Sequence, residues 1–485
     1  MKNKRMKQWL SVLMAAVLTL GSPAITADSA QAAETTAEIL QDSTDREINF
    51  NKDWKFLFDE TEHVDAGGKD YNDSSWENVQ IPHDFSITQE FSNDYEAESG
   101  FLPGGTGWYR KNVVFPASYG GKSVILNFDG VYNNAYVYIN GTKIGEHHYG
   151  YTNFSFDISD LITCDGTSEN VIAVKAVSEF PSSRWYSGAG IYRDVTLTVA
   201  DPVHVGLNGT YVTTPQLEAQ KDGDVTVKVE TTVQNDSNTQ INAAVRTTIL
   251  DAKGTTVSKS PAENTLSIAA ENSEKQTQEI TVNKPKLWDC DNPNLYDVKT
   301  EILVGGKVVD TYTTEFGFRY FAYDANTGFS LNGTKMKMKG VCMHHDQGAL
   351  GAAAYRDAVY RQVEILKEMG CNAIRASHNA PSKILLEACN ELGMLMMDEV
   401  YDGWAYAKNG NSNDFSKYFN QTLGENNHLI GGSSDEKWYQ FALESFVNRD
   451  KNDPSVVMWS IGNEINFGVP GTTNPTYVTE YEGYA

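Results

Sequence analysis

The stretch from residue 371 to residue 400, CNAIRASHNAPSKILLEACNELGMLMMDEV, decides the fold of the last third of this 485-residue chain. It begins with an apolar run, Cys371–Ala376, that predicts a strand. Pro381–Leu392 predicts a helix, with proline at its start and Gly393 directly after its end, the preferred places for these two residues. Met394–Asp398 predicts a second strand. Because both strands are almost wholly apolar, the alternation indicates buried parallel β-structure.

The same alternation continues on both sides of this stretch. Before it, Met336–Val341 predicts a strand and Tyr355–Met369 an amphipathic helix that ends at Gly370. After it, Glu436–Asn448 predicts a helix and Val456–Ile461 a further strand. Strands that alternate with helices in this way are compatible with a (β/α)8 barrel or with a doubly wound sheet.

Polar side chains follow each predicted strand at its carboxyl end. They are His344, His345 and Asp346; Arg375, Ser377, His378 and Asn379; Asp398 and Glu399; and Asn463 and Glu464. Each group alone also suits an ordinary role, such as a helix cap or a salt bridge. Their recurrence at matching ends favours a barrel, whose active sites are built there. A doubly wound sheet would usually carry a glycine-rich phosphate turn, which the sequence lacks.

These residue types suit the hydrolysis of glycosidic bonds. That reaction needs one carboxylic acid to protonate the leaving oxygen and, for retention, a second carboxylate about 5–5.5 Å away. Glu464 is the best candidate for the acid. Tyr401, Trp404 and Trp459 could offer flat apolar surfaces to a sugar ring, although Trp459 equally suits the barrel core.

Two β-rich blocks precede the predicted barrel. In the first, Ala135–Ile139 runs into Asn140-Gly141, the strongest short signal for a hairpin. The spacing of its strands indicates a jelly roll, which we place at 46–200. The second block suits an immunoglobulin-like β-sandwich at 201–320, without the Cys…Trp…Cys pattern of antibody domains. With the barrel region at 324–485, we expect a multidomain β plus α/β protein.

The N-terminus resembles an export signal. Lys2, Lys4, Arg5 and Lys7 precede the apolar run Trp9–Leu20, and Ala30-Gln31-Ala32 offers a cleavage site. We therefore expect a signal peptide at 1–32 and a secreted or cell-surface protein. No later apolar run reaches the length of a membrane span. The net charge of −25 argues against nucleic acid as a partner. The five cysteines form no CxxC pair, so a zinc or redox site has no support.

Several motifs together resemble those of glycoside hydrolase family 2, and within it the β-galactosidases. They are GVCMHHD at 340–346, IRASHN at 374–379, MDE at 397–399 and WSIGNE at 459–464, together with GWYR at 107–110, RWYSGAGIYRD at 184–194 and NPNLY at 292–296. The resemblance implies a jelly-roll sugar-binding domain, an immunoglobulin-like sandwich and a (β/α)8 TIM barrel. It also implies hydrolysis of terminal β-galactosides with retention, and it allows a homo-oligomer.

The resemblance assigns roles to individual residues. Glu464 would be the general acid/base, and Asn463 would bind the 2-hydroxyl of the sugar. Arg375, His378 and His344 would line the sugar subsite, with Asp398 and Glu399 in a supporting role. Magnesium-dependent members carry Glu-x-His after the acidic pair, whereas this chain reads VYDGW at 400–404. Magnesium or sodium is thus implied only by the family, and we assign no metal ligands.

In this family the nucleophilic glutamate follows the acid/base on a later strand, several tens of residues further along. The sequence ends at Ala485 with only four of the eight predicted barrel strands. We therefore expect an incomplete barrel that is catalytically deficient as an isolated polypeptide. Two alternatives stay open: β-glucuronidase or β-mannosidase specificity within the family, and a non-catalytic carbohydrate-binding protein that uses the jelly-roll domain.

Overall fold

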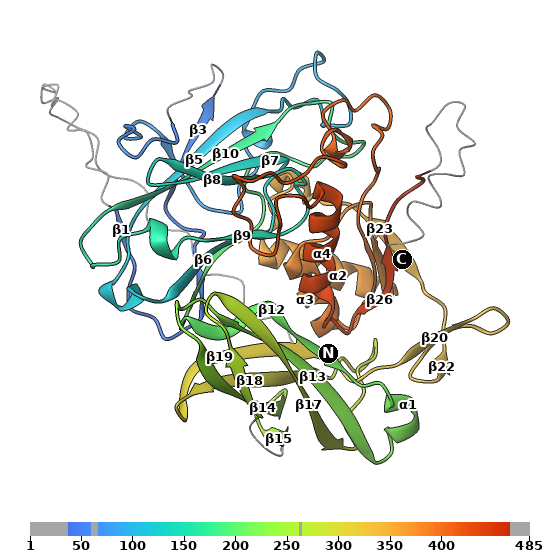
Figure 1. The fold of residues 1–485 in the computed structure, drawn as a ribbon. Coiled ribbons are helices and arrows are strands. Elements are labelled where there is room, and N and C mark those ends of the chain that lie inside the picture. Colours follow the sequence, from blue (N-terminus) through green and yellow to red (C-terminus); the bar gives the residue numbers. More distant parts are fainter. Residues whose placement is uncertain (1–36, 60–65, 261–263, 466–485) are drawn as a thin grey trace, which may run out of the picture. The chain divides into compact units, whose positions relative to one another are not determined.

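The computed structural model describes residues 37–59, 66–260 and 264–465, and strands predominate in it (Figure 1). The signal peptide expected at 1–32 lies outside the described residues. No helix in the described ranges is long and apolar enough to cross a membrane.

The first domain is a β-sandwich of two sheets. One sheet has the order β4 (Glu77–Val79), β3 (Trp54–Asp59), β5 (Gly105–Val114), β10 (Asn170–Ser178), β7 (Asn134–Ile139) and β8 (Thr142–His147), with β1 (Glu38–Ile39) beside β5. The other has the order β2 (Glu47–Asn49), β11 (Val195–Ala200), β6 (Ser123–Phe128) and β9 (Phe154–Asp157). Three short 3-10 helices lie at Ser86–Thr88, Ala117–Tyr119 and Ser159–Leu161. The predicted hairpin is confirmed, because β7 and β8 meet at Asn140-Gly141, both with positive φ.

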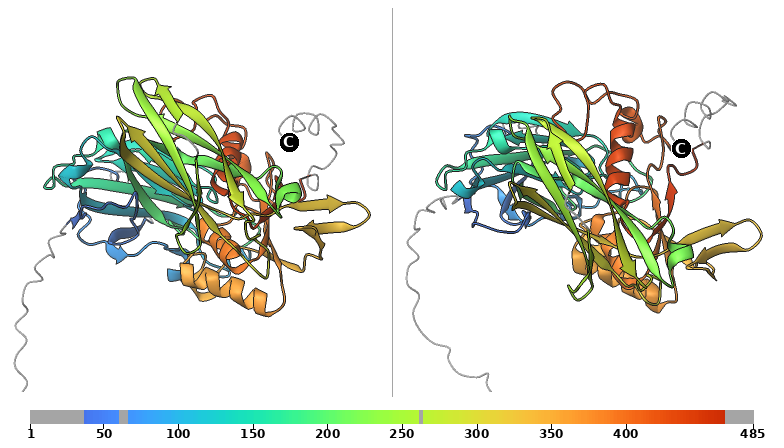
Figure 2. Two further views of the ribbon diagram at one scale, coloured as in Figure 1. Left: turned by 90° about the horizontal axis from the view of Figure 1, so that it is seen from below. Right: turned by 60° about the horizontal axis from the view of Figure 1, so that its bottom comes forward.

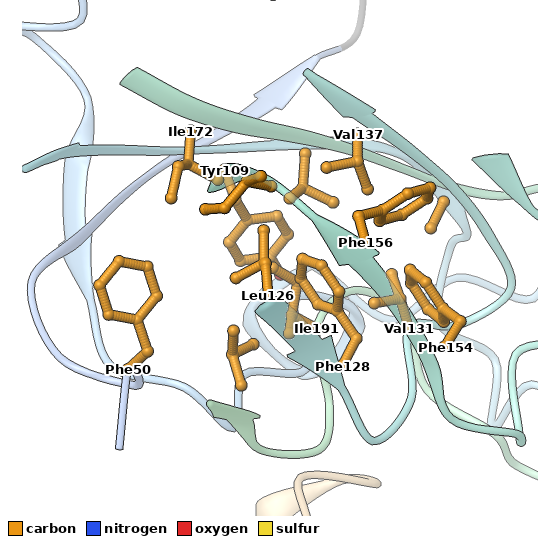
Figure 3. Packing of buried hydrophobic residues seen from close by; sticks show 14 of the residues in the cluster. Phe50, Tyr109, Leu126, Phe128, Val131, Val137, Phe154, Phe156, Ile172 and Ile191 are labelled. Atoms are coloured by element: carbon orange, nitrogen blue, oxygen red, sulfur yellow. The ribbon is translucent and has the colours of Figure 1, made fainter. Parts of the chain in front are cut away.

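A core of aromatic and branched side chains fills the space between these two sheets. Figure 3 shows Leu126 and Phe128 of β6 and Phe154 and Phe156 of β9 directed into it, together with Val137 and Ile172 of the facing sheet. Successive residues of a strand point to opposite faces. The side chains between them, such as Asn127 and Ser155, therefore lie on the outer face of the second sheet.

The second domain is also a two-sheet β-sandwich, whose long strands are green and yellow in Figure 2. Its sheets are β12 (Val203–Thr213), β13 (Asp224–Asn235) and β17 (Asn272–Asn283), and β15 (Thr256–Lys259), β14 (Ile241–Asp251), β18 (Tyr296–Val304) and β19 (Lys307–Phe316), with β16 (Asn264–Ile268) beside β14. A one-turn helix, α1 (Leu217–Gln220), precedes β13. Alternate residues of β13, from Val225 to Val233, are buried, which explains the period of two in the sequence.

The third region contains the parallel sheet that the sequence predicts. Its order is β23 (Gly340–Met343), β24 (Ala373–Ala376), β25 (Leu395–Glu399) and β26 (Val456–Ser460), and all neighbouring strands are parallel. The helices between them are α2 (Arg356–Glu368), α3 (Lys383–Leu392) and α4 (Trp438–Asp450), and 3-10 turns lie at Gly348–Leu350 and Phe415–Lys417. A small antiparallel sheet precedes it: β20 (Phe321–Asp324), β21 (Gly328–Leu331) and β22 (Thr334–Lys335).

Several boundaries differ by a few residues from the sequence prediction, and two of these differences have a cause in the hydrogen bonding. Met336 does not begin the first parallel strand, because its backbone N–H donates to Phe329 of the small antiparallel sheet at 3.1 Å. Pro381 lies before α3 and not inside it. The hydroxyl of Ser382 accepts a hydrogen bond from the backbone N–H of Leu385 at 3.3 Å and so caps the helix.

Candidate active site

The carboxyl ends of three neighbouring strands bring four predicted residues into one hydrogen-bonded cluster. Arg375, the third residue of β24, donates from Nε and Nη2 to the two carboxylate oxygens of Glu399, each at 2.9 Å. Nδ1 of His378 lies 2.8 Å from Glu399 Oε1. Nη2 of Arg375 also donates to Oδ1 of Asn463, beyond the end of β26, at 3.1 Å.

Glu399 holds this cluster together as a buried anion. Its side chain is fully buried, and burial by itself would raise its pKa. Hydrogen bonds from His378, Ser460 and Arg375 outweigh burial, so the pKa of Glu399 is lowered. This buried carboxylate fixes the orientation of Arg375 and His378, whose side chains are 30% and 11% exposed.

Asn463 links the cluster to a second group of charges. It is 5% exposed, and its backbone N–H donates to the carbonyl of Tyr401 at 3.1 Å. Its amide nitrogen donates to Asp402 Oδ1 at 2.9 Å. Although burial acts to raise it, the pKa of Asp402 is lowered by hydrogen bonds from Arg184 and Asn463 and by the charge of Lys408.

Arg184 belongs to the β-sandwich domain, yet its guanidinium reaches this site. Its Nε donates to Asp402 Oδ2 at 2.9 Å, and its Nη1 lies 3.8 Å from the carboxylate of Glu464. Glu464 has a positive φ of 49° and a side chain that is 60% exposed. It therefore lies next to the cluster with its carboxylate open to solvent, and its ion pair is with Arg184 and not with Arg375.

His344 borders the same cluster on the side of β23. Its ring centroid lies 5.4 Å from that of His378 and 4.1 Å from that of Trp185, whose indole is 41% exposed. Burial and the neighbouring His378 lower the pKa of His344, which favours a neutral ring. His345 points elsewhere: its Nδ1 lies 3.4 Å from Nη2 of Arg193.

Asp398 is not brought to this cluster. It precedes Glu399 in β25 and therefore faces the other side of the sheet, where it is fully buried beside Asp450 and Arg449 of α4. Burial, followed by the charge of Asp450, raises the pKa of Asp398 well above its usual value. The structure thus separates the two acidic residues that the sequence treats as a pair.

The three aromatic candidates differ in exposure. Tyr401 is buried, and its backbone N–H donates a hydrogen bond to the hydroxyl of Tyr149 at 3.2 Å. Nε1 of Trp404 donates to the carbonyl of Ile461 at 2.8 Å, and Trp459 is 42% exposed. Trp459 is paired with Asp398 in the sheet and packs against Phe446 of α4, so it lies on the face away from the cluster. Of these two residues, only Trp404 borders the site. Among the described residues, no group of three or more His, Cys, Asp or Glu side chains is arranged to hold a metal ion.

Sequence reasoning missed Arg184 and Asp402 as members of the site. Asp402 stood out only because it departs from the magnesium motif, and Arg184 lies more than 200 residues from the strands that it contacts. The motif that contains Arg184 resembles a family motif. Neither the periodicity nor the spacing of the sequence predicts that the Arg184 side chain lies beside the barrel.

Comparison with known proteins gives consecutive matches along the chain. Residues 49–201 match the family model described as glycosyl hydrolases family 2, sugar binding domain. Residues 204–319 match glycosyl hydrolases family 2, and residues 325–477 match its TIM barrel domain. These matches confirm the predicted order of a jelly-roll sandwich, an immunoglobulin-like sandwich and an incomplete (β/α)8 barrel.

Individual proteins of the same family also match most of the chain. A β-galactosidase from Bacteroides ovatus, BoGH2A, is 41% identical over 86% of this chain and 46% of its own length. A β-glucuronidase from Formosa agariphila is 31% identical over 74% of this chain and 38% of its own. The crystal structure of a glycosyl hydrolase family 2 member from Bacteroides cellulosilyticus has a TM-score of 0.79 and 38% identity, over 87% of this chain and 52% of that one.

The chain spans about half the length of the curated relatives that it matches. The matched regions nevertheless follow one another with short gaps from residue 49 to residue 477. The site described above lies within them, at the strand ends of the barrel region. The chain belongs to glycoside hydrolase family 2 and is β-galactosidase-like.

Proposed function

We propose that this protein takes part in the hydrolysis of terminal β-galactosides with retention, and that Glu464 is its general acid/base. The observation that carries the proposal is the cluster of Arg375, His378, Glu399 and Asn463 at the strand ends, directly beside Glu464. Strand ends of this kind form the active sites of (β/α)8 barrels. An exposed carboxyl group beside a preorganised polar cluster suits proton donation to a bound glycoside.

The side-chain amide of Asn463 is held in one orientation by two hydrogen bonds, and this supports the proposal. Its Oδ1 accepts from Arg375, and one hydrogen of its Nδ2 goes to Asp402. The orientation of the amide is fixed by these two bonds, and the second hydrogen of Nδ2 is available to a sugar hydroxyl. A contact to the 2-hydroxyl strengthens as positive charge develops on the ring in the transition state.

Retention also requires a second carboxylate that attacks the anomeric carbon. Glu399 and Asp402 each form an ion pair with an arginine, with Arg375 and Arg184 respectively. We assign neither of them as the nucleophile. After Glu464 has given up its proton, the nearby guanidinium of Arg184 attracts the carboxylate that results.

The pairing of the cations favours a neutral sugar over a glucuronide. Arg375 is paired with Glu399, while Arg184 and Lys408 share the two carboxylates of Asp402 and Glu464. A glucuronide brings its own carboxylate, which needs a cation that is not already neutralised. Galactose brings only hydroxyl groups, which accept and donate hydrogen bonds beside such pairs.

The test is a titration of the purified 485-residue chain with D-galactose and with D-glucuronate, followed by isothermal calorimetry. Galactose should bind, and Asn463→Ala should weaken that binding by about tenfold through the lost hydrogen bond. The matched control, Asn283→Ala in the second sandwich, should bind as the wild type does. Tighter binding of glucuronate than of galactose would overturn the assignment of substrate.

The role of Glu464 is tested by activity. In a preparation that hydrolyses an aryl β-galactoside, Glu464→Gln should lower kcat by about 10²–10⁴-fold, the range for loss of a general acid. Galactose affinity should stay close to that of the wild type, since glutamine keeps the shape of the side chain. A Glu464→Gln variant with wild-type kcat would sink the assignment.

A further inference from the structure

Lys408 is a cation of the site to which the proposed hydrolysis gives no role beyond that of a counter-charge. It lies in the loop between β25 and α4, and its side chain is 11% exposed. Its ammonium group donates to the backbone carbonyl of Asn463 and lies 3.5 Å from Asp402 Oδ1. Lys408 therefore contacts the residue directly before Glu464.

Neutralisation of Asp402 does not account for this position. Arg184 already binds both carboxylate oxygens of Asp402. Burial lowers the pKa of Lys408, the charge of Asp402 acts against this, and the charge of Arg184 lowers the pKa further. A buried lysine gains little from a second place at a carboxylate that an arginine already occupies. What Lys408 adds is its contact with the carbonyl of Asn463.

The carbonyl of Asn463 belongs to the peptide group that leads into Glu464. Glu464 has a φ of 49°, in the left-handed region that residues other than glycine rarely adopt. Such a conformation persists only where the surroundings hold the backbone in place. A hydrogen bond from a charged ammonium group is stronger than one between neutral groups, so it suits this purpose.

The other polar groups of Asn463 are held as well. Its backbone N–H donates to the carbonyl of Tyr401 at 3.1 Å, and its side-chain amide is bound between Arg375 and Asp402. These contacts fix Asn463 as far as its Cα, but they leave the rotation of the following peptide group undetermined. The hydrogen bond from Lys408 fixes that rotation.

The loop that carries Lys408 is itself fastened. The backbone N–H of Asn411 donates to the carbonyl of Lys408 at 3.0 Å. Two residues further along, the backbone N–H of Asn413 donates to the carbonyl of Pro181 in the jelly-roll domain, also at 3.0 Å. The ammonium group is thus presented to Asn463 by a loop that is hydrogen-bonded to another domain.

We infer that Lys408 is a positioning residue for the acid/base, and that its ammonium group holds the peptide between Asn463 and Glu464 and so keeps the Glu464 carboxylate beside Arg184. The inference rests on the proposed function, because it says how Glu464 is held and not what Glu464 does. Without the ammonium group this peptide can rotate, and the carboxylate leaves the position from which it protonates a glycosidic oxygen.

The first test separates rate from binding. In a preparation that hydrolyses an aryl β-galactoside, Lys408→Met should lower kcat by about 10²-fold, the effect of a displacement of about 1 Å at a catalytic group. Galactose affinity should stay close to that of the wild type, because the amide of Asn463 keeps both of its hydrogen bonds. Lys408→Arg, which keeps a cationic donor, should recover most of the lost rate. A loss of galactose affinity as large as the loss of kcat/KM would overturn the inference.

The second test does not depend on activity. In the 485-residue chain labelled with 15N-glutamate, the amide resonance of Glu464, identified by its absence in Glu464→Gln, reports on the peptide that Lys408 holds. Lys408→Met should move this resonance, whereas Lys417→Met, at an exposed side chain of the same loop, should not. If Lys408→Met melts below the wild type, Lys408→Gln takes its place. An unmoved resonance in a variant that melts with the wild type would show that Lys408 does not hold this peptide.

The two proposals fail separately. If Lys408→Met moves the Glu464 amide while Glu464→Gln keeps the wild-type kcat, Lys408 holds the peptide and the assignment of the acid/base fails. If Glu464→Gln lowers kcat as expected while Lys408→Met keeps the wild-type kcat, the proposed function stands and the role of Lys408 fails.

Discussion

Asp453 lies beside the buried carboxyl groups of Asp398 and Asp450 and the guanidinium of Arg449, behind the parallel sheet. Burial, and then the charge of Asp450, raises the pKa of Asp453 from 3.8 to about 7. At a pH between these two pKa values, the carboxyl group of Asp453 is ionised in the unfolded chain and protonated in the folded chain. Stability therefore falls as pH rises from about 4 to 7, and the loss is complete above the folded pKa.

We expect Asp453→Asn to remove part of this loss. The variant should match the wild type near pH 4 and be more stable by about 1–2 kcal/mol near pH 8, because a neutral amide replaces a buried charge. Urea titrations at both pH values measure the difference. Asp435→Asn, at an exposed side chain, is the control and should leave the pH dependence unchanged. A stability difference that is the same at both pH values would contradict the prediction.

Single residues also show where sequence reasoning about the site ends. Arg375, His378, Glu399 and Asn463 were placed together because parallel strands align their carboxyl ends, a rule that holds for any such sheet. Asp398 was placed with them, but a shift of one position in a strand reverses the face. Arg184 could not be placed, since its contact depends on how one domain packs against another.

Two helices of the barrel region end in glycines that differ in their surroundings. Gly370 follows α2 with a φ of 89°, and a Cβ there would meet nothing within 4 Å. Gly393 follows α3 with a φ of 71°, and a Cβ there would lie 2.5 Å from the carbonyl oxygen of Cys290. Both require the left-handed conformation, but only Gly393 also requires the absence of a side chain.

Alanine at the two positions should therefore have unequal effects. Gly370→Ala should cost about 1–2 kcal/mol, the penalty of a left-handed non-glycine residue. Gly393→Ala should cost at least about 1 kcal/mol more, because the carbonyl of Cys290 must shift as well. Free energies of unfolding from urea titrations compare the pair, and equal losses would refute the steric argument.

At the scale of elements, the sequence predicted which segments form strands and helices better than where they begin. The apolar residues of β24, α3 and β25 are those that become buried, so their pattern in the sequence predicts these elements. The start of β23 depends on Met336 pairing with Phe329, and the start of α3 on the hydroxyl of Ser382. Such choices between competing hydrogen bonds are made by tertiary structure.

At the scale of the molecule, Arg193 joins the jelly-roll domain to the barrel region. It is 1% exposed and donates to the carbonyls of Tyr151, Ala380 and Pro381 at 2.7, 2.8 and 3.1 Å. Arg193→Met should lower the free energy of unfolding by about 3 kcal/mol, because buried carbonyls lose their donor. Arg246→Met is the control: Arg246 pairs with Glu301 inside one sandwich and should cost less than about 1 kcal/mol. Equal urea midpoints for the two variants would show that the hydrogen bonds of Arg193 do not stabilise the contact between the jelly-roll domain and the barrel region.

The reach of Arg184 from the jelly-roll domain to Asp402 and Glu464 has a consequence for protein engineering. A chimera that joins a foreign jelly roll to this barrel would replace the guanidinium while every barrel residue stayed in place. Glu464 would lose its described ion pair, and Asp402 its bidentate partner. The loop at 184–185 thus has to be inherited with the barrel, even though domain boundaries drawn along the chain assign it elsewhere.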